Sequence, residues 1–102
     1  MSPTTVPPEV SHLVSRAADA VRELLGPATR VLWYGSWVSG TAVPRSDVDL
    51  AVAADRQIPP VLMARLREQI DALPTLRKID LVDVHQVGDA LRERILSEGL
   101  VL

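Results

Sequence analysis

Three aspartates are the residues of this sequence best placed to do chemistry together. Asp47 and Asp49 alternate within a run of strand-forming residues, so both side chains should leave the same face of a strand. Asp80 lies in a second apolar run that we expect to be buried, where a carboxylate is costly unless it is paired or metal-bound. Grouped carboxylates repel one another and persist mainly where a cation neutralises them. With oxygen ligands and no cysteine or histidine nearby, these residues predict a site for Mg²⁺ or Mn²⁺.

A glycine and a serine supply a complementary anion-binding element. Gly35 follows a short β-branched and aromatic run, and a glycine there lets the backbone approach a ligand closely. A helical turn after Ser36 would offer free N–H groups to an anion, and the serine hydroxyl adds a donor. The usual phosphate-loop pattern G-x-x-x-x-G-K-[ST] is absent, and Gly35 and Gly40 do not fit G-x-G-x-x-G. A phosphate-binding turn beside a divalent cation predicts a site for a nucleoside triphosphate.

Six elements should position these residues. Apolar spacing and the breakers Gly and Pro predict helices at about 10–25, 60–73 and 89–98, and strands at about 30–34, 47–53 and 79–84. This order predicts an α/β domain with a small mixed sheet of about three strands and flanking helices. We expect residues 1–8 to be a flexible tail and residues 9–102 to form a single domain.

Composition excludes several classes of protein. The chain has 102 residues, a net charge of −2 and no cysteine, so disulfides, thiol chemistry and cysteine-rich zinc sites are excluded. The sequence has two histidines, His12 and His85, which excludes an H-E-x-x-H zinc site. The charge balance gives no reason to expect direct binding to nucleic acid or membranes. The absence of signal-peptide features and of long apolar runs favours a cytoplasmic location.

The spacing around the first two aspartates resembles a known pattern. Gly35 and Ser36, ten residues, and then Asp47 and Asp49 resemble the G-S-x10-D-x-D signature of the polymerase-β-like nucleotidyltransferases. More narrowly, the chain resembles the minimal nucleotidyltransferases (MNT), the small antitoxin partners of HEPN-domain RNase toxins. The segments 79–82 (I-D-L-V) and 95–102 are also similar to the third-acid strand and the end of these short proteins, so the resemblance spans residues 31–102.

The resemblance implies a polymerase-β-like fold and a Mg²⁺-dependent protein adenylyltransferase. It implies that Asp47 and Asp49 hold two Mg²⁺ ions (Mn²⁺ is an alternative) and that Asp80 ligates metal on the acceptor side and helps to take the hydroxyl proton. Gly35, Ser36 and Ser46 would bind the phosphates of ATP. The transfer of AMP to a tyrosine of a HEPN RNase toxin would silence it within a hetero-oligomer.

Departures from the family pattern leave a second function open. Relatives often carry basic residues where Trp37 and Val43 stand here, and Arg45 can supply part of that charge. The alternative is therefore a non-catalytic antitoxin that neutralises the toxin by stoichiometric binding.

The remaining aromatic and polar residues near these segments allow two interpretations each. We expect Trp33 and Tyr34 to pack in the core, whereas Trp37 either packs or contacts a base or partner. Asp83 should leave the strand face opposite to Asp80 and act structurally. We expect His85 to cap a loop or face solvent rather than to act as a general base.

Overall fold

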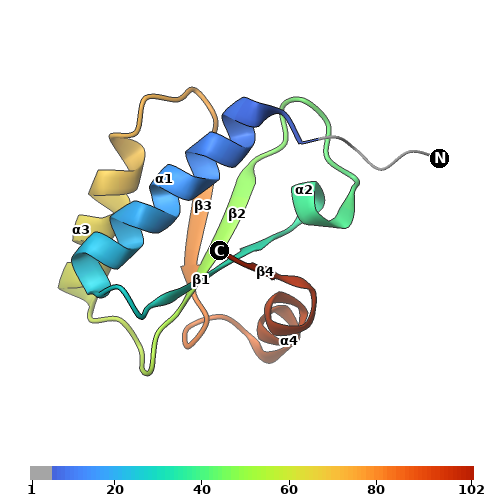
Figure 1. Ribbon diagram of the computed structural model, residues 1–102. Coiled ribbons are helices and arrows are strands. Elements are labelled where there is room, and N and C mark those ends of the chain that lie inside the picture. The colour runs from blue at the N-terminus through green and yellow to red at the C-terminus, as the bar shows by residue number, and fades with distance from the viewer. Residues whose placement is uncertain (1–5) are drawn as a thin grey trace.

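Helices cover both faces of a four-stranded sheet in the computed structural model, which describes residues 6–102 (Figure 1). Along the chain the elements are α1 (Pro8–Leu25), β1 (Arg30–Tyr34), α2 (Ser36–Ser39), β2 (Val48–Ala53), α3 (Pro60–Asp71), β3 (Ile79–Asp83), α4 (Asp89–Glu98) and β4 (Leu100–Val101). The predicted α/β class, the three strands and the three long helices are confirmed. Residues 1–5 of the expected tail lie outside the described residues, and α1 begins at Pro8.

The sheet is mixed, with the strand order β3-β2-β1-β4. β1 pairs antiparallel with β2 and with β4, whereas β2 and β3 are parallel. The prediction of about three strands missed β4, because two exposed residues show no alternation of apolar and polar side chains. β3 and β4 are therefore the edge strands, and β2 lies inside the sheet.

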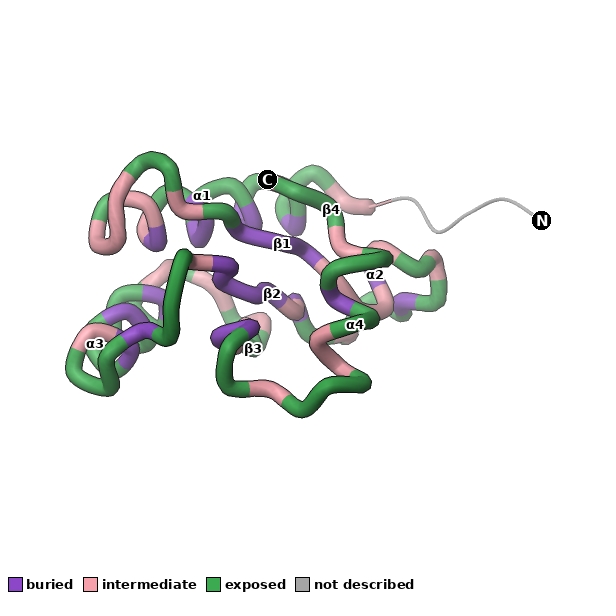
Figure 2. The backbone as a smooth tube through the Cα atoms, turned by 90° about the horizontal axis from the view of Figure 1, so that it is seen from below, coloured by how far each residue is buried: buried purple, intermediate pink, exposed green. Residues whose placement is uncertain are grey.

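The larger core lies between one face of the sheet and the helices α1 and α3. α1 is amphipathic, and its apolar residues recur every three or four positions, which is the spacing of one helix face. Those side chains pack on alternate residues of the inner strands, such as Val31, Leu50 and Val52, all fully buried. Figure 2 shows that most of β1 and β2 is buried between the helices.

A smaller core on the opposite face is covered by α4. Its buried members are Leu32, Ala51, Ala53, Val84 and Ile95. At the end of the sheet where β1 stops and β2 and β3 begin, this face carries polar residues in place of apolar ones. Among residues 6–102 there is no helix with the length and apolar character needed to cross a membrane.

Candidate functional site

Strand register places two of the predicted acids side by side. Asp49 in β2 is the register partner of Asp80 in β3, and on its other side it is the partner of Tyr34 in β1. Neighbouring strands lie about 4.8 Å apart, so these three residues form one row across the sheet. Two residues along each strand, on the same face of the sheet, Leu32, Ala51 and Val82 belong to the smaller core. The row therefore lies on the face that α4 covers.

The charges of this row act on one another. Burial raises the pKa of the Asp49 carboxyl group, and the negative charges of Asp80 and Asp47 raise it further. The positive charge of Lys78 lowers it. The three aspartates that the sequence singled out therefore lie within electrostatic range of one another, at the end of the sheet that also holds Gly35.

Two expectations about these acids were wrong. Asp80 is exposed, not buried, because β3 is an edge strand. β2 begins at Val48 and not at Asp47, which is an exposed residue just before the strand. Because the carboxylates of Asp47 and Asp80 are exposed, their desolvation costs little. The burial of these two charges is therefore not a reason to expect a cation at this site.

The donor chemistry of the three aspartates fits a hard cation, whereas their present arrangement is open. All potential ligands are carboxylate oxygens, which Mg²⁺ and Mn²⁺ prefer. Among residues 6–102, however, no three acidic or histidine side chains already form a group that could hold a metal ion. Asp47 and Asp80 are exposed, so their side chains can rotate toward the half-buried Asp49 without repacking the core.

Gly35 brings the backbone of the glycine-serine turn against Asp49. Its φ is +86°, and a Cβ atom at this position would lie 2.2 Å from Oδ2 of Asp49. Any side chain would therefore overlap with the carboxylate. The Gly35 carbonyl accepts the N–H groups of Val38 and Ser39, and these hydrogen bonds form the first turn of the short helix α2. A hollow of about 370 Å³ opens here between Gly35, Val38, Ser39 and Glu98.

Ser46 holds the loop between α2 and β2. Its hydroxyl accepts the N–H of Val43 at 2.8 Å, and its own N–H donates to the carbonyl of Val43 at 2.9 Å. Trp37 Nε1 donates to the carbonyl of Ser46 at 3.2 Å. The Trp37 side chain is only 4% exposed, which leaves little ring surface for stacking on a base, so of its two interpretations the structure favours packing.

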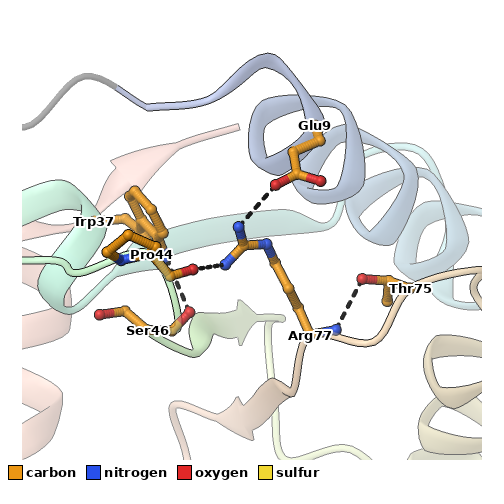
Figure 3. A network of polar contacts seen from close by, with 6 residues as sticks. All are labelled: Glu9, Trp37, Pro44, Ser46, Thr75 and Arg77. Atoms are coloured by element: carbon orange, nitrogen blue, oxygen red, sulfur yellow. Dashed lines mark hydrogen bonds and ion pairs between the residues drawn. The ribbon is translucent and has the colours of Figure 1, made fainter.

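Arg77 joins this loop to two other segments, as Figure 3 shows. Its guanidinium donates to the carbonyl of Pro44 at 2.6 Å and to Oε1 of Glu9 at 2.8 Å. It also lies 5.5 Å from the centroid of the Trp37 ring, within cation–π range. The backbone N–H of Arg77 donates to Oγ1 of Thr75. The sequence carried no signal for this network, because Glu9 and Pro44 are distant from Arg77 along the chain.

Tyr34 is a second residue whose place in the site the sequence did not reveal. It is partly buried against the smaller core, as predicted. It is also the register partner of Asp49, at one end of the row that contains Asp49 and Asp80. Burial, and then the charges of Asp49 and Asp80, raise the pKa of its hydroxyl to about 12. At neutral pH this group is therefore a neutral donor beside two carboxylates.

The two polar residues at the end of β3 are structural. Asp83 is only 2% exposed, and its carboxylate accepts the N–H groups of Ile58 at 2.8 Å and His85 at 2.9 Å. His85 is exposed, and its Nε2 lies 2.6 Å from the carbonyl of Ala54. The predictions of a structural acid and a loop-capping histidine are confirmed.

A family model identifies the family to which the chain belongs, and solved structures share its fold. The family described as "Polymerase beta, Nucleotidyltransferase" matches residues 28–102. No curated protein matches the chain in a direct search. Eleven solved chains match it in structure.

Three solved structures show the range of these neighbours. A toxin–antitoxin complex with AMP-PNP superposes with a TM-score of 0.67 at 24% identity, covering 85% of this chain and 69% of that one. A complex of tri-AMPylated Shewanella oneidensis HEPN toxin with MNT antitoxin gives 0.65 at 19%, covering 89% and 69%. A proposed minimal nucleotidyltransferase gives 0.67 at 27%, covering 91% and 95%.

Proposed function

Because this chain belongs to the polymerase β nucleotidyltransferase family, we propose that it transfers AMP from ATP to a hydroxyl group of a protein partner. The observation that carries the proposal is the contact between the glycine-serine turn and the row of acids. Gly35 leaves no room for a side chain beside Oδ2 of Asp49, and Asp49 is in register with Asp80. A turn suited to phosphate and carboxylates suited to a divalent cation thus share one end of the sheet.

Each residue has a role in the proposed reaction. The N–H groups and hydroxyl of the turn at Gly35 and Ser36, together with Ser46, bind the phosphates of ATP, and the Ser46 hydroxyl also accepts the N–H of Val43 in the adjoining loop. Asp47 and Asp49 would hold two Mg²⁺ ions, with Asp80 as a further ligand on the acceptor side. When bound, these ions would neutralise the triphosphate and stabilise both the attacking and the leaving oxygen.

The transfer balances within these groups and the two substrates. A bond forms between the acceptor oxygen and the α-phosphorus of ATP, and the bond from that phosphorus to pyrophosphate breaks. Asp80, exposed on the edge strand, accepts the proton of the acceptor hydroxyl. Pyrophosphate leaves on the side of Gly35 and Ser36.

We place the acceptor on a HEPN RNase toxin, in the form of a tyrosine hydroxyl, within a cytoplasmic hetero-oligomer. Two of the structural neighbours support this partner, since one is a toxin–antitoxin complex with AMP-PNP and another contains an AMPylated HEPN toxin. Their sequences share less than a quarter of their residues with this chain, so they establish the fold and motivate the partner.

The test is a transfer assay with matched aspartate variants. The chain is mixed with a HEPN-domain RNase, Mg²⁺ and ATP, and the RNase is weighed by mass spectrometry. We expect wild type to add the mass of AMP, and Asp47→Asn to bind the partner without adding mass. Asp55→Asn is the control, because Asp55 is an equally exposed acid beyond the opposite end of β2.

A stoichiometric antitoxin is the alternative outcome. Two observations favour it: no group of three acids among residues 6–102 is already closed around a metal site, and buried Trp37 occupies a position where relatives often carry a basic residue. If Asp47→Asn still neutralises the RNase and wild type forms no adduct, the chain acts by binding and not by catalysis.

A further inference from the structure

An open groove lies next to Asp47, on the side of the loop that faces α1 and the α3–β3 connection. Its volume is about 810 Å³, and residues at its wall include Pro44, Arg45, Asp47, Leu76, Arg77 and Lys78. It shares no lining residue with the hollow at Gly35. The acids and the glycine-serine turn are therefore bordered by separate hollows: this groove at Asp47, the hollow at Gly35, and a third of about 270 Å³ that includes Asp80.

Two cations that line this groove differ from Arg77 in their contacts. Arg45 and Lys78 are exposed, and among residues 6–102 neither forms an ion pair. Arg77 differs, because Glu9 and the carbonyl of Pro44 already engage its guanidinium. The wall of the groove is thus held by Arg77. With no ion pair to the described residues, Arg45 and Lys78 can meet an anion, although the charge of Lys78 also acts on Asp49.

Strand order places this groove on the acceptor side of the site. Gly35 approaches Asp49 from the β1 side, whereas Lys78 leads into β3 on the opposite side of β2. The carbonyl of Lys78 accepts the N–H of Val48 at 3.0 Å, which fixes it beside the start of β2. In-line displacement puts the attacking hydroxyl opposite to the leaving pyrophosphate. If pyrophosphate leaves at Gly35, the acceptor approaches from the β3 side, which this groove borders together with the hollow at Asp80.

We propose that this groove binds an anionic group that the acceptor carries close to its reacting hydroxyl, and that Arg45 and Lys78 are the cations that hold it. Two sources have this chemistry: a carboxylate beside the acceptor tyrosine, and the phosphodiester of a nucleotide already attached to it. Either would form charge-assisted hydrogen bonds with both side chains. The assignment of the anion to the acceptor rests on the proposed function, whereas the binding of an anion in the groove does not.

Binding of labelled tyrosine peptides without Mg²⁺ or ATP tests the groove by fluorescence anisotropy. One peptide has glutamates beside the tyrosine, a second has glutamines, and a third has glutamines and an O-adenylylated tyrosine. We expect wild type to bind at least one charged peptide about tenfold more tightly than the uncharged one, as about 1.4 kcal/mol from charge-assisted contacts would give. The preferred peptide identifies the source of the anion.

Charge-reversal variants decide whether the groove is responsible for the preference for charged peptides. Arg45→Glu and Lys78→Glu should abolish the preference, and Lys78→Gln should weaken it in a chain with an unchanged melting temperature. Arg56→Glu and Arg65→Glu are matched controls, because both residues are exposed and lie outside the groove. No preference in wild type, no binding at all, or an equal loss in the control variants would overturn the proposal.

The same peptides separate this inference from the proposed function. After addition of Mg²⁺ and ATP, a chain that prefers the charged peptides but adenylylates none of them, nor the HEPN partner, keeps the groove and loses the proposed activity. A chain that binds and adenylylates charged and uncharged peptides equally keeps the activity and loses the groove, whereas equal adenylylation with preferential binding removes only the assignment of the anion to the acceptor.

Discussion

Replacing Gly35 by alanine tests the contact on which the site depends. Gly35 (φ +86°, ψ −157°) and Gly26 (φ +110°, ψ 151°) have backbone conformations of the same, almost glycine-specific class. An added Cβ meets nothing within 4 Å at Gly26, whereas at Gly35 it lies 2.2 Å from the Asp49 carboxylate. Gly26→Ala is therefore a matched control that contains the backbone strain without the collision.

The expected magnitudes follow from this difference. Backbone strain should cost about 1–3 kcal/mol in both variants. In Gly35→Ala the carboxylate of Asp49 must also move, and overpacking of this kind adds about 1–3 kcal/mol. Each kcal/mol lowers the melting temperature of a domain of this size by about 4–8 °C. Gly35→Ala should therefore melt at least about 4 °C below Gly26→Ala.

A double-mutant cycle identifies the colliding group. Asp49→Ala removes the carboxylate, so Gly35→Ala should cost less in that background, by about the collision energy, whereas the cost of Gly26→Ala should not change. Urea unfolding and thermal melts, both without Mg²⁺, measure all five variants and wild type. If Gly35→Ala costs no more than Gly26→Ala, or if Asp49→Ala gives no relief, the turn does not lie against Asp49 and the site as described is wrong.

Three further perturbations test the charges around the site. The raised pKa of Asp49 means that its ionised form destabilises the fold, so the stability gained by protonation is lost as pH rises through that pKa. Asp49→Asn should flatten this pH dependence of melting without Mg²⁺ and melt higher at pH 7; a lower melting temperature would refute the argument. Asp83→Ala leaves two backbone N–H groups unpaired and should cost about 2–4 kcal/mol in urea unfolding, against less than about 0.5 for Asp55→Ala; equal costs would contradict the structural role. The single tyrosine, Tyr34, should ionise near pH 12 in ultraviolet titration, and Asp49→Asn should lower that midpoint; a midpoint unchanged in the variant would show that the two groups do not interact.

The sequence was sufficient for the features that depend on neighbours along the chain. Helix periodicity located α1 and α3, because residues three or four apart share one face of a helix. The strand run that contains Asp49 could likewise be located without knowledge of its partner strands, although β2 begins at Val48 and leaves Asp47 just outside it. The glycine-serine turn and its spacing to these acids pointed to the family that the comparison found.

Tertiary structure decided the features that depend on which strands pair and which segments meet. The exposure of Asp80 follows from the edge position of β3, and no property of the run around Asp80 distinguishes an edge strand from a buried one. β4 could not be predicted for the same reason, because its two residues form a strand only by pairing with β1. The engagement of Arg77 by Glu9 and Pro44, which leaves Arg45 and Lys78 available in the groove, joins segments that only folding brings together. Local patterns report the faces of single elements, whereas register, edges and long-range polar contacts exist only once the elements have packed.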